Sequence, residues 1–128
     1  MNTKISKPMT LIIILAFSLA ACSGGGSGKS DEVVEAVGVG LPDGTITNLT
    51  ITNGSVNFQI ESTLEEQISF YRGNTSANGL TERTLLTSIT DTSVSYVFDG
   101  NASGQAVVIQ MVDLGDGSIN VNIRLENV

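Results

Sequence analysis

The chain has 128 residues, a net charge of −7, one cysteine, no histidine and no tryptophan. This length allows one domain. The lack of histidine removes the commonest general base and metal ligand, and with it every Ser-His or Cys-His catalytic pair. One cysteine excludes intrachain disulfides and multi-cysteine zinc sites, and the acidic balance argues against binding to the phosphate backbone of nucleic acid. We therefore expect a protein that is not an enzyme and has no cofactor, no metal site and no nucleic-acid partner.

The N-terminal residues have the pattern of a secretory signal peptide. Lys4 and Lys7 form a short basic region, and an apolar stretch of 13 residues follows from Met9 to Ala21. A helix that spans a bilayer needs about 20 apolar residues, so this stretch is too short to be a membrane anchor. The order of charge and hydrophobicity predicts that residues 1–21 are a signal peptide that is cleaved.

The end of this signal contains the single cysteine of the chain. The sequence Leu19-Ala20-Ala21-Cys22 resembles the lipobox of bacterial lipoproteins. The resemblance implies that the Cys22 thiol receives a diacylglyceryl group, that cleavage occurs before it and that the new amine is acylated. Two or three acyl chains anchor a protein stably, whereas one is marginal. Ser23 in place of Asp implies sorting to the outer membrane, facing the periplasm.

A tether is expected between the lipid and the fold. Residues 22–30 hold the lipidated cysteine and a run of glycine and serine, which is typical of a flexible linker. Gly28-Lys29-Ser30 resembles the end of a phosphate-binding loop, but Ser23 stands where that motif needs glycine, so we reject nucleotide binding. After cleavage four basic and 13 acidic residues remain, a net charge of −9, which favours solubility and repels anionic surfaces.

The rest of the chain, residues 31–128, is predicted to be a single domain of the α+β class. Its first ten residues fit a strand or a short helix, and the pattern leaves both open. Thr45–Thr52 and Ser55–Glu61 flank Asn53-Gly54, a strong hairpin signal. Apolar residues alternate well in the second strand, and a bulge near Thr47-Asn48 would bring the first into phase.

One helix is expected, over about residues 62–78. Ser62-Thr63-Leu64-Glu65 fits a capping box, and an apolar stripe at helical spacing follows from Leu64 through Ile68 to Tyr71. The residues at 73–76 are poor helix formers, which predicts an end or fraying near Arg72.

Alternation with a period of two returns after the helix. It predicts strands at Thr81–Thr90, Ser93–Phe98, Gln105–Val112 and Ile119–Glu126. The third of these is apolar on both faces, as in a central strand. The predicted fold is an antiparallel sheet of about five to six strands with one helix packed on one face. The other face is then solvated or meets a partner.

The domain also bears a resemblance in pattern, over about residues 56–126. Phe70-Tyr71-Arg72, then Asn78-Gly79-Leu80-Thr81-Glu82, then four strands are similar to small bacterial lipoprotein domains in which a meander follows a helix. The layout is also similar to the helix-grip domains of a lipoprotein of the outer-membrane barrel-assembly machine. Such domains mostly lack an assigned activity, so the resemblance implies no functional residues.

Candidate chemistry is sparse, and we assign no catalytic and no metal-binding residue. Asp113 and Asp116 share one turn, which fits a hairpin turn better than a calcium loop because the spacing of an EF-hand is absent. Glu65 and Glu66 are adjacent on the predicted helix and cannot converge as an acid-base pair. Phe70 and Tyr71 are also adjacent, so both cannot face the core squarely.

Two hypotheses about function follow. The first is a lipid-anchored envelope protein, without enzymatic activity, that binds an envelope protein or serves a structural role. The second is a carrier of a small apolar or lipid ligand between the helix and the sheet. The first predicts a flat or exposed apolar patch, whereas the second predicts a concave apolar cavity.

The anchor is tested by Cys22→Ala. The thiol is the attachment atom, so we expect the variant to lose incorporation of radiolabelled palmitate while the parent chain is labelled. Undiminished labelling of the variant would refute the assignment.

Overall fold

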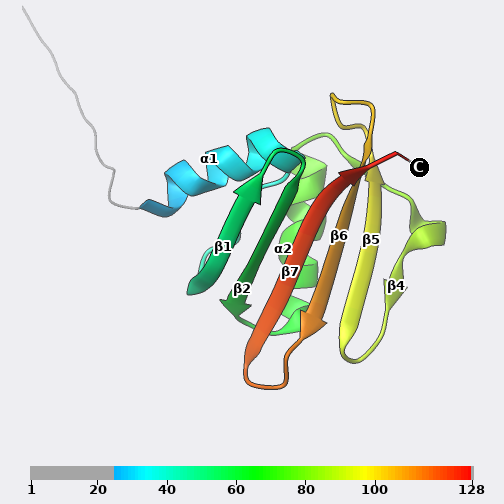
Figure 1. The fold of residues 1–128 in the computed structure, drawn as a ribbon. Helices are drawn as coiled ribbons and strands as arrows, with labels where there is room; N and C mark the ends of the chain where they lie inside the picture. The colour runs from blue at the N-terminus through cyan, green and yellow to red at the C-terminus, as the bar shows by residue number, and fades with distance from the viewer. Residues whose placement is uncertain (1–24, 128) are drawn as a thin grey trace, which may run out of the picture.

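The structure is a computed structural model, and it describes residues 25–127. The predicted signal peptide, the predicted lipobox and Cys22 lie outside these residues. The described part contains two α-helices, one short 3-10 helix and seven strands (Figure 1). In chain order these are α1 Gly25–Val37, β1 Ile46–Thr52, β2 Ser55–Glu61, α2 Leu64–Ala77, β3 Thr81–Glu82, η3 Thr84–Leu86, β4 Ser88–Ile89, β5 Ser93–Asp99, β6 Ala106–Asp113 and β7 Ser118–Glu126.

The strands form one antiparallel sheet in the order β1-β2-β7-β6-β5-β3, and β4 also pairs with β5. The predicted α+β class, with an antiparallel sheet and helix packing, is confirmed. The sheet has more strands than the five to six expected because one predicted strand is divided into β3 and β4. At one edge lies β1, and at the other edge the short strands β3 and β4 share the side of β5 (Figure 1).

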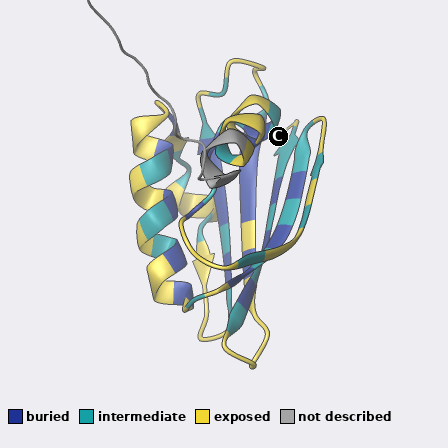
Figure 2. Cartoon of the chain, turned by 90° about the vertical axis from the view of Figure 1, so that its left-hand side faces the viewer, coloured by how far each residue is buried: buried dark blue, intermediate teal, exposed yellow. Residues whose placement is uncertain are grey.

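One face of the sheet carries the core. Every second residue of the long strands β2, β5, β6 and β7 is buried on the same side, beneath the helices (Figure 2). The largest of these side chains are Phe58, Ile60, Tyr96, Phe98, Ile109, Met111, Ile119 and Ile123. Both helices contribute to this same cluster, through Val33 and Val37 of α1 and Leu64 and Tyr71 of α2. The opposite face of the sheet is not covered by either helix.

The structure has two helices where one was expected, and the additional helix is α1. Gly25–Ser30, expected to be part of a flexible tether, lies in α1, and the segment from residue 31 that was left open is helical as far as Val37. Glycine and serine are weak helix formers, and α1 is stabilised instead by burying Val33 and Val37 against β1, β2 and β7. Gly38, at a φ of +86°, ends the helix and donates its N–H to the Val34 carbonyl at 2.8 Å.

The helix expected over about residues 62–78 is confirmed as α2, with two differences. Its capping box uses Thr63 and Glu66, one residue later than predicted: the Glu66 N–H donates to Thr63 Oγ1 and the Thr63 N–H to the Glu66 carboxylate. The helix also continues past Arg72 to Ala77. Burial of Thr75, whose hydroxyl donates to the Tyr71 carbonyl at 2.6 Å, holds the last turns on the core.

The two helices meet at Gly40, in the segment that leaves α1. The buried Tyr71 hydroxyl donates to the Gly40 carbonyl at 3.2 Å, and the Gly40 N–H donates to Asn74 Oδ1 at 2.8 Å. The next N–H, of Leu41, donates to Ser30 Oγ. A Cβ atom on Gly40 would lie 2.8 Å from that same oxygen, so glycine permits this close approach.

The hairpin at Asn53-Gly54 forms as predicted, with Thr52 opposite Ser55. The expected bulge is also present, because the register of β1 against β2 shifts between Thr47 and Thr50. Asn48 lies inside it at a φ of +55° and donates its side-chain amide to Gln59.

The predicted strand over Thr81–Thr90 is wrong in its middle. Only Thr81–Glu82 and Ser88–Ile89 pair with β5, and the 3-10 turn η3 lies between them. The Leu86 N–H donates to the Arg83 carbonyl and the Thr87 N–H to the Thr84 carbonyl, which turns these donors away from the sheet.

The role of the Tyr71 hydroxyl is tested by a pair of variants. Tyr71→Phe leaves the buried Gly40 carbonyl without this donor, so we expect unfolding free energy to fall by about 1–3 kcal/mol. Tyr96→Phe removes a buried hydroxyl that has no hydrogen-bond partner among the described residues, so we expect no loss. Urea denaturation measures both, and equal losses would contradict the assigned bond.

Candidate functional site

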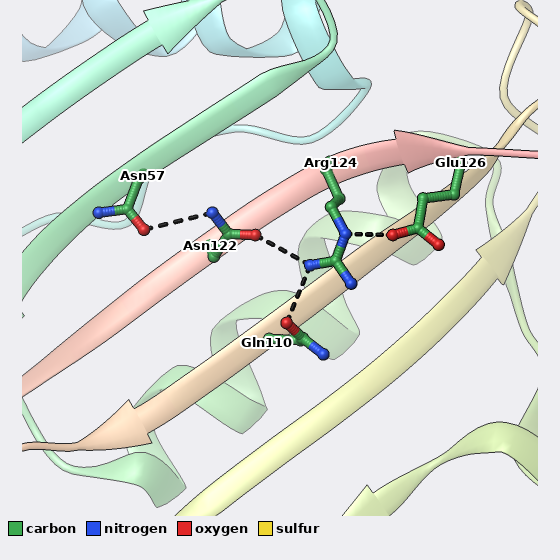
Figure 3. Close-up of polar contacts among 5 residues, drawn as sticks. All are labelled: Asn57, Gln110, Asn122, Arg124 and Glu126. Carbon is green, nitrogen blue, oxygen red and sulfur yellow. Dashed lines mark hydrogen bonds and ion pairs between the residues drawn. The ribbon is translucent and has the colours of Figure 1, made fainter.

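The uncovered face of the sheet carries a connected array of polar side chains (Figure 3). Asn57 of β2 accepts hydrogen bonds from the amides of Asn120 and Asn122 of β7, at 3.2 and 3.3 Å. Arg124 donates to Asn122 at 3.0 Å and to Gln110 of β6 at 2.8 Å. These side chains fix one another across three neighbouring strands.

The array carries one charge of each sign, because Arg124 forms an ion pair with Glu126 two residues along β7. A small apolar cluster of Val97, Ala106 and Val108 lies on the same face of β5 and β6. This face therefore presents amide donors and acceptors and an ion pair, while its three short apolar side chains are buried. Such a surface matches the usual solvated face of an antiparallel sheet.

The edge formed by η3 and β4 carries an exposed apolar surface. Leu85 is 98% exposed, Leu86 49% and Ile89 47%. We call these three residues the apolar edge. Single exposed apolar residues are common, whereas three within five consecutive positions form a patch of the kind that marks contact sites.

Ion pairs hold the base of the apolar edge. Arg83 donates to both carboxylate oxygens of Asp99, at 2.6 and 2.8 Å, a bidentate geometry that is stronger than a single contact. This pair raises the pKa of the Arg83 guanidinium and lowers the pKa of Asp99. On the helix side, Arg72 lies 3.7 Å from Glu82, and Glu82 accepts from the Thr87 hydroxyl. The ends of the segment are thus fixed while its leucines face solvent.

The interior between α2 and the sheet is filled by aromatic side chains. Tyr71, Phe58, Tyr96 and Phe98 are all buried there, and Arg72 lies above the Tyr96 ring at 5.4 Å from its centre. Desolvation raises the pKa of both tyrosines. These four side chains belong to the same core cluster as the buried valines of α1.

A hollow of about 570 Å³ opens to solvent near the end of α1. Polar groups of Asn53, Asn78, Asn101, Ser103 and Gln105 line it, from two loops and the α2 cap. Val34, Ala36, Leu80 and Leu125 also line it, so polar and apolar groups share its surface.

The remaining residues considered in the sequence have structural partners. Asp113 accepts from the Gly115 N–H and Asp116 from the Ser118 N–H, at 2.8 and 3.0 Å, so both carboxylates form turns. Glu66 caps α2, and this backbone hydrogen bond lowers its pKa. Within residues 25–127 no group of three or more acidic or cysteine side chains could hold a metal ion.

The other considered residues lie apart from the apolar edge. Phe70 is half-buried and contacts the buried Tyr71 edge-on, with the ring centres 4.8 Å apart. Lys29 and Ser30 belong to α1, where Lys29 pairs with Glu32 at 3.6 Å. In the part of the chain that the structure describes, no helix is long and apolar enough to cross a membrane.

Comparison with known proteins adds no relative: no family model, no curated protein and no solved structure matches this chain.

The sequence reasoning missed the apolar edge because it assigned Leu85 and Leu86 to a continuous strand. A signal was present. Two adjacent leucines cannot both face the core of a half-buried strand, because neighbouring side chains point to opposite faces. One of the two was therefore bound to lie on the solvated side.

The Arg83–Asp99 ion pair predicts that the stability of the fold depends on pH. The pKa values of Asp99, Asp116 and Glu66 are lowered in the fold by the hydrogen bonds that they accept. The unfolded chain therefore takes up protons first, and stability present above a pH of about 4 is lost as the pH falls further. We expect Asp99→Asn to lower the melting temperature at pH 6, and the difference from the parent to narrow as the pH falls below about 4. A difference in melting temperature between variant and parent that stays the same at every pH would contradict this role.

Proposed function

We propose that this protein is a lipid-anchored envelope protein, without enzymatic activity, that binds a protein through the apolar edge. The single observation that carries the binding role is the exposure of Leu85, Leu86 and Ile89 on one short segment. Leaving these side chains in water forgoes the free energy that burial in an interface would supply, about 1.5–3 kcal/mol for Leu85 and about half of that for each of the half-exposed Leu86 and Ile89.

The membrane attachment rests on Leu19-Ala20-Ala21-Cys22 and the apolar stretch before it. The lipid on Cys22 makes the membrane the first partner, and Ser23 supports an outer-membrane location facing the periplasm. Because α1 begins at Gly25, three peptide units separate the lipidated residue from the fold. They reach about 11 Å at full extension, so the domain would be held close to the bilayer.

The location of the apolar edge supports a protein as its occupant. It lies at the β4 side of the sheet, whereas α1 begins beyond the β1 side (Figure 1). The lipid would therefore be attached at the far side of the fold from the apolar edge. A patch of three side chains beside ordered ion pairs also suits a hot spot in a protein interface, where a few residues carry most of the binding energy.

The proposal is tested by photocrosslinking in intact envelopes. A photoreactive residue at position 88, next to the apolar edge, is expected to form an adduct with a protein, and Leu85→Ser in the same chain is expected to remove it. Leu114→Ser is the matched control, because Leu114 is also partly exposed, at 43%, but lies in the turn between β6 and β7. No adduct, or adducts that Leu85→Ser leaves unchanged, would overturn the proposed function.

A further inference from the structure

The segment that carries the apolar edge has an unusual composition. Thr84–Thr90 reads Thr-Leu-Leu-Thr-Ser-Ile-Thr and contains no charged residue, no proline and no glycine. Its residues are β-branched, apolar or small and polar, which is typical of segments that pair as strands. Native proteins usually protect a sheet edge with charges or proline, and this segment has neither.

The fold leaves this strand-forming segment mostly unpaired. Only Ser88 and Ile89 pair with β5, and the residues before them form η3. The Thr90 N–H donates to the Ser93 carbonyl of β5. Because successive residues of a strand alternate in direction, the backbone N–H and carbonyl of Ile89 point away from the sheet. The local preference and the observed conformation therefore disagree here, which is typical of functional sites.

The three residues of η3 make few contacts of their own. Two backbone hydrogen bonds close η3, and Thr87 contacts Glu82 through its hydroxyl. None of the residues of η3 is buried. Opening the turn into an extended strand would also release β3 and Arg83 from β5. Arg83 and Ser88 bond to β5 at Val97 and Ser95, only two residues apart, and the five-residue step between them is too long for that span when extended. A strand beside the opened segment would supply new hydrogen bonds in place of those lost.

The charged residues on either side of the segment indicate which chain could supply a neighbouring strand. Arg83 precedes the segment and Asp91 follows it. If two copies pair antiparallel with Thr87 opposite itself, Arg83 of each copy leaves Asp99 of its own chain and lies opposite Asp91 of the other. The same register places Leu85 opposite Ile89, so the apolar and the charged residues both match.

We propose that Thr84–Thr90 is the edge through which two copies of this chain associate as a two-fold antiparallel strand pair centred on Thr87. This inference rests on the proposed function and names the protein that occupies the apolar edge. The pair buries Leu85 and Ile89 of both copies in one contact, and the segment itself brings no charge into it although the chain is strongly acidic. The interface is closed because both copies use the same edge. The other edge, β1, has a different sequence and a bulge, so it does not offer a second site of the same kind.

Disulfide trapping of the full-length lipidated chain in envelopes tests the register. In the proposed pair the two Thr87 Cα atoms lie about 5.5 Å apart, within the range that a disulfide bridges. We expect Thr87→Cys to give a covalent dimer on oxidation. Thr90→Cys is the control on the same edge, because two copies of residue 90 would lie about 20 Å apart along the strands. Thr52→Cys is the control on β1, and the parent chain controls for Cys22.

A second measurement does not depend on cysteine. Sedimentation of the lipidated protein in mild detergent should show a dimer, and Leu85→Ser should raise its dissociation constant about tenfold to a hundredfold. Leu114→Ser should leave it unchanged. A monomer at all concentrations, or equal trapping at positions 87, 90 and 52, would overturn the inference. Photocrosslinks to a different protein without a self-adduct would also overturn it, while leaving the proposed function standing.

Discussion

The fold depends on burying one face of a single sheet. Four long strands place alternate apolar side chains on that face, and neither helix has another surface on which to pack. At Gly40, the Tyr71 hydroxyl and the Asn74 side-chain oxygen of α2 bind the backbone segment that leaves α1. This contact links the two helices on the buried face of the sheet. With both helices on the same side, the polar face remains open and the β4 edge is left to short strands. The uncovered polar face and the β4 edge are therefore the surfaces of the sheet that remain available to partners.

Much of this arrangement could be predicted from local pattern. Strict alternation located β2, β5 and β7, and Asn53-Gly54 located the hairpin, because these signals depend only on neighbouring residues. The helix α1 was one of two alternatives from residue 31 and was not expected over Gly25–Ser30, since glycine and serine disfavour a helix and the burial of Val33 and Val37 supplies the stabilisation. The division of Thr81–Thr90 was missed for the opposite reason: local preference favours a strand, but most of the segment has no strand beside it.

The functional surfaces differ in how far the sequence reveals them. Leu19-Ala20-Ala21-Cys22 is a local motif and is recognised without a structure, and its role as an anchor remains a prediction. The amide array around Arg124 reads in sequence as ordinary alternation, and the hydrogen bonds that connect it become visible only when β2, β6 and β7 are side by side. The apolar edge required the exposures of Leu85, Leu86 and Ile89, because its composition alone resembles that of a buried strand.

The central claim is that this sheet edge is incomplete in the single chain. Amide hydrogen exchange on the lipidated protein, compared at low and high protein concentration, tests it most directly. In the proposed pair, the N–H groups of Leu85, Thr87 and Ile89 become hydrogen-bonded across the two-fold axis. We predict that their exchange slows as concentration rises, while amides at the outer edge of β1 are unaffected. Fast exchange at these three positions at every concentration would contradict the account.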